Sequence, residues 1–312
     1  MKNLKAYIQT LKEENNLDIN DYFLEKDYML SLFLSVWAQE ETPALNQLIF
    51  KGGTLLTKNY LQYHRISEDL DFTHQDANTI RELAPKQQEK EIKKRITQII
   101  EDVNTISKKA GFKFETDRTN ETYIELRNSR KLYILKPHYK SIYTGIESHI
   151  KIEIAFTEDI INQPTKQTIK TILNYHQINE TTKKILNYNL QEPELQTYTI
   201  QEITLEKIRA CITRIQFKPR DVYDLYLIHQ EHNILQTDQE QIIKKIKANP
   251  FQEEDINNNI KKFLKEITKI NYEEIEELAL KPINKEDFEK FWEQLEKKLK
   301  TIAKKHLTNT TQ

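Results

Sequence analysis

Two adjacent glycines and a pair of carboxylates separated by one residue are the parts of this sequence best suited to chemistry. Gly52 and Gly53 are two of the four glycines in 312 residues. The apolar run before them predicts the end of a strand, and the spacing from Thr54 onward predicts a helix. Glycine lets a backbone take positive φ and approach a ligand closely. Free amide groups at the start of that helix, with the positive end of its dipole, predict an anion site suited to phosphate.

The carboxylates follow in Asp69-Leu70-Asp71-Phe72. On a strand, Asp69 and Asp71 would point to one face while Leu70 and Phe72 point into the core. Neighbouring carboxylates repel each other unless a cation lies between them, and hard oxygen ligands beside phosphate favour Mg²⁺. A phosphate-binding turn facing a metal-binding strand is what nucleotidyl transfer requires. The alternative is an ordinary turn followed by a solvated acidic strand end.

A third acidic side chain is predicted on a later strand. Residues 149–156 alternate polar and apolar, which predicts a strand with Lys151 and Glu153 on one face. In the same sheet, the Glu153 carboxylate would complete the metal site begun by Asp69 and Asp71. The alternative is an exposed edge strand carrying ordinary charges.

These residues resemble a known family. Lys51-Gly52-Gly53-Thr54, followed by Ser67-Glu68-Asp69-Leu70-Asp71, is similar to the signature of the AbiEii/AbiGii-type nucleotidyltransferases. That family includes type IV and MenT-type toxins within the DNA polymerase β-like superfamily. Segments 23–28 and 218–225 are also similar to family segments, so the resemblance spans most of the first three quarters of the chain.

The resemblance implies roles for individual residues. It makes Asp69 and Asp71 catalytic metal ligands and Glu153 a further metal ligand, and it implies that the nucleotide is bound by Lys51, Gly52, Gly53, Thr54, Arg65 and Ser67. It also places Lys207 and Asp221, from a later helical part, at the mouth of the cleft as catalytic residues. An ammonium suits a triphosphate oxygen, and an acid can orient it or accept a proton. Arg220 and Asp224 are adjacent alternatives, and an ion pair between helices is the purely structural one.

The implied function is metal-dependent transfer of a nucleotide from an NTP, with Mg²⁺ or alternatively Mn²⁺. The implied acceptor is tRNA or another RNA, and the implied role is that of a toxin paired with a cognate antitoxin in phage defence. One alternative is a small-molecule, antibiotic-modifying nucleotidyltransferase. Another is an inactive nucleotide-binding partner protein, against which the presence of both Asp69 and Asp71 argues.

The elements that must position these residues follow from apolar spacing and end signals. Helices are predicted over 21–37, 80–110, 204–215, 219–228, 239–249, 255–268 and 285–306, with Gly111 ending the second. Strands are predicted over 112–115, 122–127 and 131–135. Glu25, Lys26 and Asp27 are predicted to form a charged helix face, which the resemblance raises to candidate supports of the active site.

Composition bounds the class of protein. Charged residues at 30 % and hydrophobic ones at 38 % predict a soluble globular chain, and 47 Lys+Arg against 48 Asp+Glu mean that any RNA surface needs segregated patches. The single Cys211 excludes an internal disulfide and a cysteine zinc site. No apolar signal core or membrane-length run is present, so a cytoplasmic protein without membrane association is expected.

The expected fold is α+β. A polymerase β-like, mixed-sheet nucleotidyltransferase core with N-terminal helices would occupy residues 1–158, because composition shifts after Phe156. A mainly α-helical domain closing the cleft would follow over 159–312.

Overall fold

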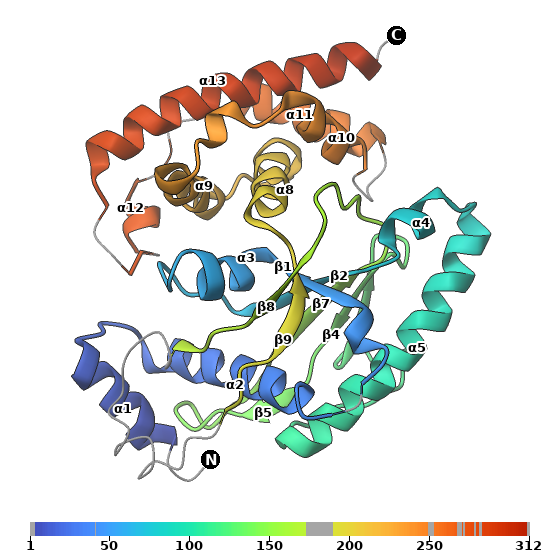
Figure 1. Cartoon of the computed structure of the whole chain (residues 1–312), viewed down its shortest axis with the longest axis vertical. Helices are drawn as coiled ribbons and strands as arrows, with labels where there is room; N and C mark the ends of the chain where they lie inside the picture. Colours follow the sequence, from blue (N-terminus) through green and yellow to red (C-terminus); the bar gives the residue numbers. More distant parts are fainter. Residues whose placement is uncertain are drawn as a thin grey trace. The chain divides into compact units, whose positions relative to one another are not determined.

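The computed structural model describes residues 4–40, 42–172, 190–248, 253–266, 270, 272–277, 279–280 and 283–310. The chain forms two compact units. Unit 1 comprises Met1–Thr157 and Pro164–Thr197, and unit 2 comprises Glu158–Gln163 and Tyr198–Gln312. Strands and helices follow one another in the order expected of an α+β protein, so that fold class is confirmed (Figure 1). The single domain boundary after residue 158 stays a prediction, because a compact unit need not fold independently.

Among the described residues, unit 1 contains a seven-stranded mixed sheet in the order β3-β4-β7-β2-β1-β9-β8. The strands are β1 Leu48–Lys51, β2 Asp69–His74, β3 Ile124–Arg127, β4 Leu132–Leu135, β7 Lys151–Ala155, β8 Thr165–Thr168 and β9 Glu194–Thr197. Strand β2 pairs antiparallel with β1 and parallel with β7, so the strands predicted to carry the acids are neighbours. Since β7 also pairs with β4, the edge-strand alternative is wrong. A separate hairpin joins β5 His138–Lys140 to β6 Glu147–His149.

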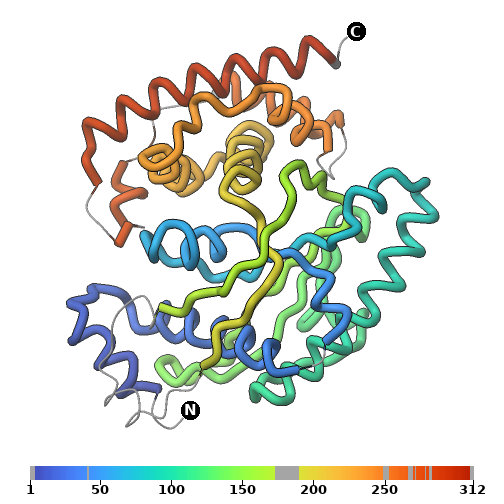
Figure 2. Tube along the Cα trace, viewed as in Figure 1, coloured from blue at the N-terminus to red at the C-terminus, as the bar shows by residue number. Residues whose placement is uncertain are grey.

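Several strands and one strand boundary differ from the prediction, and the β5–β6 hairpin was not predicted. Strands β8 and β9 were not predicted, although β9 pairs with β1 and β8 with β9 (Figure 2). They are short, and β8 consists of polar, mostly exposed residues at the sheet edge, so hydrophobic alternation gives no signal. The strand predicted over 112–115 is wrong, because Lys113 forms only an isolated bridge to His138. Strand β3 begins at Ile124, two residues later than predicted.

The helices of unit 1 follow the end signals in the sequence. They are α1 Leu4–Asn15, α2 Asp21–Trp37, α3 Gly52–Leu55, α4 Ala77–Glu82 and α5 Pro85–Ala110, with the 3-10 turn η1 Leu45–Gln47 and the π-helical segment η2 Leu56–Tyr60. Asn20 caps α2 by accepting from the Tyr22 amide at 2.9 Å. Gly111 ends α5 at φ +79°, as predicted. The single helix from residue 80 is wrong, because Pro85 starts a new helix.

Unit 2 is helical in its described residues. It contains α8 Ile200–Thr213, α9 Pro219–Glu231, η3 Ile234–Gln236, α10 Gln239–Lys247, α11 Glu253–Glu266, α12 Tyr272–Glu276 and α13 Lys285–Thr310. Helix α8 packs against α9, α10, α11 and α13 (Figure 1). Pro219 opens α9 as predicted, whereas α8 begins four residues before Thr204 because Thr199 caps it. The predicted ends at Asn249 and Thr268 lie outside the described residues.

Among the described helices, none combines the length and the apolar character needed to cross a bilayer.

His74, at the end of β2, is held neutral inside unit 1. Its ring stacks on Phe156 with centroids 5.5 Å apart. Nδ1 accepts from the Asp76 amide at 3.1 Å, and Nε2 lies 3.2 Å from Gln47 Oε1. Burial lowers the pKa of His74 to about 4, although the nearby Asp76 carboxylate opposes the shift.

The free energy of unfolding of His74→Gln should therefore fall less with decreasing pH than that of wild type. A histidine whose pKa is lowered in the folded state binds a proton more readily in the unfolded chain. The stability that comes with neutral His74 is therefore fully present above pH 6.5 and is lost as the pH falls to 4. The full shift corresponds to roughly 3 kcal/mol. Urea unfolding between pH 7 and pH 4.5 should show a smaller loss for His74→Gln than for wild type. His232→Gln, at an exposed position, is the matched control, and equal losses in all three proteins would contradict this role of His74.

Candidate active site

The two aspartates of β2 share one face of the sheet. Leu70 and Phe72 alternate with them and are fully buried, at 0 % and 1 % exposure. Phe72 packs on Phe50 of β1 at a centroid distance of 5.1 Å. The apolar residues thus fix which way the strand faces, and the two carboxylates necessarily point to the other side.

Neighbouring strands add charged side chains to the same face. Asp71 lies opposite Lys51 on β1 and opposite Glu153 on β7. Asp69 lies opposite Lys151. Residues in register on paired strands project to the same side. The structure therefore brings together the three acids that the sequence proposed as a set, with two lysines between and beside them.

On this face of the sheet, the negative charges of the carboxylates exceed the positive charges of the lysines. Burial, followed by the charges of Glu153 and Asp69, raises the pKa of Asp71 from 3.8 to about 7, while Lys51 and Lys151 oppose the shift. The Lys151 ammonium contacts Glu153 and lies 3.8 Å from Asp69 Oδ2. A cation bound beside Asp71 would relieve the repulsion that keeps its pKa high.

The glycine turn is built against Asp71. Strand β1 ends at Lys51, and Gly52 takes a left-handed φ of +76° as α3 begins. A Cβ at Gly52 would lie 2.1 Å from Asp71 Oδ2, well inside van der Waals contact. The turn and the acid can therefore occupy their places only because residue 52 has no side chain.

Gly52→Ala should cost both stability and activity. The left-handed φ alone costs roughly 1–2 kcal/mol for a residue with a Cβ, and the new methyl must also displace the Asp71 carboxylate. Gly145→Ala is the matched control, because Gly145 has φ +69° and nothing within 4 Å of its added Cβ. Urea unfolding and nucleotide transfer should show a greater stability loss for Gly52→Ala than for Gly145→Ala, with activity lost only in the former. Equal behaviour of the two variants would argue against the contact with Asp71.

The second glycine gathers the other residues predicted to bind nucleotide. A Cβ at Gly53 would lie 2.8 Å from Arg65 Nη2 and 3.0 Å from Ser67 Oγ. Thr54 Oγ1 lies 2.9 Å from Ser67 Oγ and donates to the carbonyl oxygen of Asp69. Arg65 is buried, and its Nη1 donates to the Ile66 carbonyl at 2.8 Å. The turn, the arginine and the start of β2 thus form one packed cluster in unit 1.

The charged helix face predicted at Glu25, Lys26 and Asp27 is wrong, because all three side chains are buried. Glu25 accepts from Ser141 Oγ at 2.6 Å and from the following backbone amide at 2.7 Å. Lys26 donates to the carbonyl oxygen of His149. Each charge is compensated by a partner distant in sequence, which local helical spacing cannot reveal.

Lys58 is a residue that the sequence analysis missed. It is buried on η2, directly after the glycine turn, and its ammonium lies 2.6 Å from Asp27 Oδ1. It also donates to Tyr63 Oη at 2.8 Å and to Ser31 Oγ at 3.2 Å. This pair ties the helix that follows the turn to α2. The only sequence signal was the family-like segment containing Asp27.

In unit 2, Lys207 of α8 pairs with both acids that the sequence left open. Its ammonium lies 2.6 Å from Asp224 Oδ2 and 3.2 Å from Asp221 Oδ1, and Asp221 also pairs with Arg214. Lys207, Asp221 and Asp224 are buried, whereas Arg220 is exposed. The ion pair between helices is present. The expectation that Lys207 and Asp221 line one cleft with Asp69 and Asp71 stays a prediction.

Removing the lysine from this cluster should destabilise the protein. Lys207→Met removes the ammonium group that lies 2.6 Å from buried Asp224 Oδ2, and breaking a buried pair in this way costs roughly 3 kcal/mol or more. Lys166→Met is the control, because that lysine and its partner Glu194 are both about 60 % exposed. Urea unfolding should separate the two variants clearly, and adding Asp224→Asn to Lys207→Met should recover part of the loss. Equal stability of Lys207→Met and Lys166→Met would contradict the buried pair.

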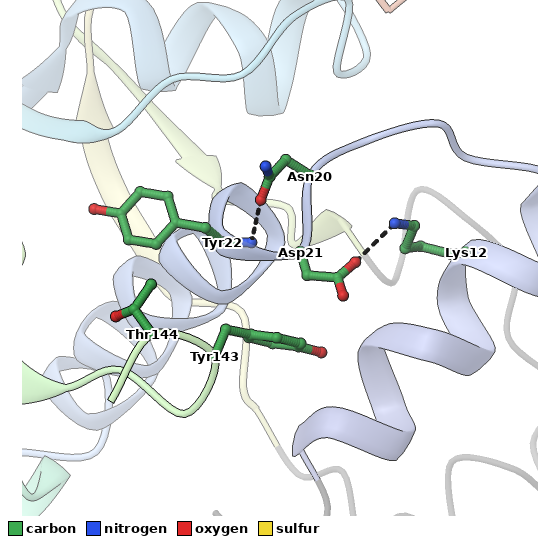
Figure 3. Close-up of a pocket in the computed structure, with 6 residues that line it drawn as sticks. All are labelled: Lys12, Asn20, Asp21, Tyr22, Tyr143 and Thr144. Atoms are coloured by element: carbon green, nitrogen blue, oxygen red, sulfur yellow. Dashed lines mark hydrogen bonds and ion pairs between the residues drawn. The ribbon is translucent and has the colours of Figure 1, made fainter. Parts of the chain in front are cut away.

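A pocket elsewhere in unit 1 has no residue of the candidate site in its lining. The depression in Figure 3 has a volume of about 400 Å³ and is lined by Lys12, Asn20, Asp21, Tyr22, Tyr143 and Thr144. Lys12 pairs with Asp21 at 2.7 Å, and the Asn20 side chain is committed to the Tyr22 amide. Lys12, Asp21 and the Asn20 side-chain oxygen are thus already engaged within the fold.

Comparison with known proteins decides the family. The family model described as the nucleotidyl transferase AbiEii toxin of the type IV toxin–antitoxin system matches residues 36–309. The chain belongs to the AbiEii family. The resemblance drawn from the sequence is therefore confirmed. No curated protein matches the chain.

Solved structures to which this chain is similar include MenT4, a nucleotidyltransferase toxin from Mycobacterium tuberculosis H37Rv. It shares 18 % identity over 88 % of this chain and 94 % of its own, with a TM-score of 0.43. JHP933 from Helicobacter pylori shares 15 % identity over 94 % of this chain and 97 % of its own, with a TM-score of 0.42.

As an AbiEii protein, the chain is a nucleotidyltransferase toxin with an antitoxin as its partner. Such an enzyme takes an NTP as substrate, and this class of reaction typically involves a divalent metal. The donor chemistry of Asp69, Asp71 and Glu153 suits such an ion, because all three offer hard oxygen atoms. Within the described part of the chain, however, no three acid, histidine or cysteine side chains are already arranged as a metal site.

Proposed function

We propose that this AbiEii toxin transfers a nucleotide from an NTP to tRNA, in the cytoplasm, as the active component of a phage-defence system. The nucleotide-transfer step is supported most directly by the glycine turn that contacts the Asp71 carboxylate, whose pKa is raised to about 7. A group of carboxylates short of positive charge, beside a glycine turn at the start of a helix, suits a metal-bound triphosphate.

Asp69 and Asp71 are the proposed catalytic metal ligands, and Glu153 is a further ligand. The ion would be Mg²⁺, or alternatively Mn²⁺. When bound, it supplies charge neutralisation for the triphosphate and lowers the pKa of the attacking hydroxyl. Asp71 lies next to Glu153 in register, so both carboxylates would lie on the face that holds the ion.

Gly52, Gly53 and Thr54 form the proposed seat of the triphosphate. Lys51 supplies a positive charge beside Asp71, since the two residues are paired in register. Arg65 and Ser67 lie against Gly53, so they are placed to hold the turn and to donate toward a phosphate oxygen. No side chain caps the start of α3, which leaves its first amides available in that respect.

Lys207 and Asp221 are proposed as further catalytic residues from unit 2. Lys207 as a compact point charge suits a triphosphate oxygen, and a buried carboxylate can orient that ammonium. Asp224 makes the shorter of the two contacts with Lys207, at 2.6 Å, so it is the better placed to orient it. Asp221, shared with Arg214, remains the proposed proton acceptor.

The test supplies purified protein with each of the four α-³²P-labelled NTPs, Mg²⁺ and total tRNA, followed by a denaturing gel. Label on tRNA with one or more NTPs, lost on addition of EDTA, is the expected result. A parallel reaction offers a hydroxylated aminoglycoside in place of RNA. Label on the drug and none on tRNA would replace our acceptor with a small molecule. Triphosphate binding without pyrophosphate release in either reaction would contradict the enzymatic proposal.

A further inference from the structure

Lys151 occupies a particular place among the three acids. It projects from β7 to the same face as Glu153 and lies opposite Asp69 in the paired strand. Its ammonium contacts Glu153 Oε1 and is 3.8 Å from Asp69 Oδ2. The side chain is 28 % exposed and has a flexible four-carbon stem, so it is not fully enclosed by the protein. A positive charge therefore already lies between two of the proposed metal ligands.

Charge balance shows what this contact does. The face carries three carboxylates, Asp69, Asp71 and Glu153, against two ammonium groups, Lys51 and Lys151. An ammonium cannot share a carboxylate lone pair with a metal ion, and it repels a divalent cation a few ångströms away.

We propose that Lys151 is a built-in counter-ion that must leave Glu153 before a divalent metal can bind, so that metal binding is coupled to the arrival of the triphosphate. This inference rests on the proposed function. The negatively charged triphosphate offers the displaced ammonium a new partner, whereas metal alone does not. The free enzyme thus binds metal weakly, and nucleotide and metal bind cooperatively.

The experiment measures Mn²⁺ binding by electron paramagnetic resonance, with and without inorganic tripolyphosphate. It compares wild type, Lys151→Met, Lys151→Gln and Lys151→Arg, with Lys166→Met as an exposed lysine control on β8. Without tripolyphosphate, Lys151→Met and Lys151→Gln should bind Mn²⁺ at least about tenfold more tightly than wild type, because one repelling charge is gone. Lys151→Arg and Lys166→Met should bind as wild type does. Circular dichroism checks that each variant is folded. If one of the two neutral variants, Lys151→Met or Lys151→Gln, does not fold, the other one is enough for the comparison.

The tripolyphosphate arm tests the coupling. Tripolyphosphate should tighten Mn²⁺ binding to wild type by a larger factor than to Lys151→Met. The reason is that only wild type has the Lys151 ammonium, which can leave Glu153 and pair with the polyphosphate. Unchanged or weaker Mn²⁺ binding in the neutral variants, with binding to wild type intact, overturns the counter-ion role and leaves the metal site standing. No Mn²⁺ binding to any variant, even with tripolyphosphate, overturns both this inference and the proposed metal site.

Discussion

Asp71→Asn should lower nucleotide transfer by about three orders of magnitude while leaving the protein folded. The change removes a charge and nearly conserves shape, so it deletes a proposed metal ligand without opening a cavity. The raised pKa of Asp71 means that the folded protein disfavours the charged form. That penalty is absent below pH 3.8 and complete above pH 7, so Asn should be at least as stable as Asp at pH 8.

The measurement combines a transfer assay with urea unfolding at pH 8. Asp18→Asn is the control, because Asp18 is an exposed aspartate of unit 1 outside the candidate site. It should change neither rate nor stability. Activity of Asp71→Asn within tenfold of wild type would mean that Asp71 is not a metal ligand. A large stability loss would instead mean that its charge supports the fold.

Asp69→Ala should abolish the growth defect that expression of the wild-type toxin is expected to cause. The Asp69 side chain is 39 % exposed, so its removal should cost little folding free energy. Its loss would take one of two aspartates from the proposed metal site. Colony counts after induction, with toxin amounts compared by immunoblot, provide the measurement. Asp18→Ala should remain as toxic as wild type, and equal growth of cells with wild type and Asp69→Ala would leave the defect unconnected to this site.

Those parts of the site could be predicted from the sequence that depend only on the alternation of side chains along a single strand. Alternation along β2 and β7 placed Asp69, Asp71 and Glu153 on defined faces, and the structure pairs those strands. Alternation could not show that β7 is a central strand, because pairing with β4 depends on long-range register. Nor could it show that Gly52 must lack a side chain on account of Asp71, since that contact links the turn at the start of α3 to a residue of β2.

Buried charges were the main failure of sequence reasoning. Glu25 reads as an exposed helix charge because its partner Ser141 lies 116 residues away. Lys58 is 31 residues from Asp27, and neither residue reveals the other through local spacing. Short, polar strands such as β8 were not predicted for a related reason. Pairing with a neighbouring strand forms them, and their own sequence has no hydrophobic alternation. Contacts between residues far apart in the sequence thus determine burial and strand pairing, which the periodicity of a single helix or strand does not reveal.

A crystal structure with Mn²⁺ and a non-hydrolysable NTP would test most directly whether this face is the metal and triphosphate site. We predict an anomalous difference peak coordinated by Asp69 and Asp71, with phosphate oxygens on the backbone amides of Gly52 and Gly53. Lys151 should be released from Glu153 in that complex. A metal peak away from β2, or a triphosphate bound without contact to the glycine turn, would contradict the assignment of this site.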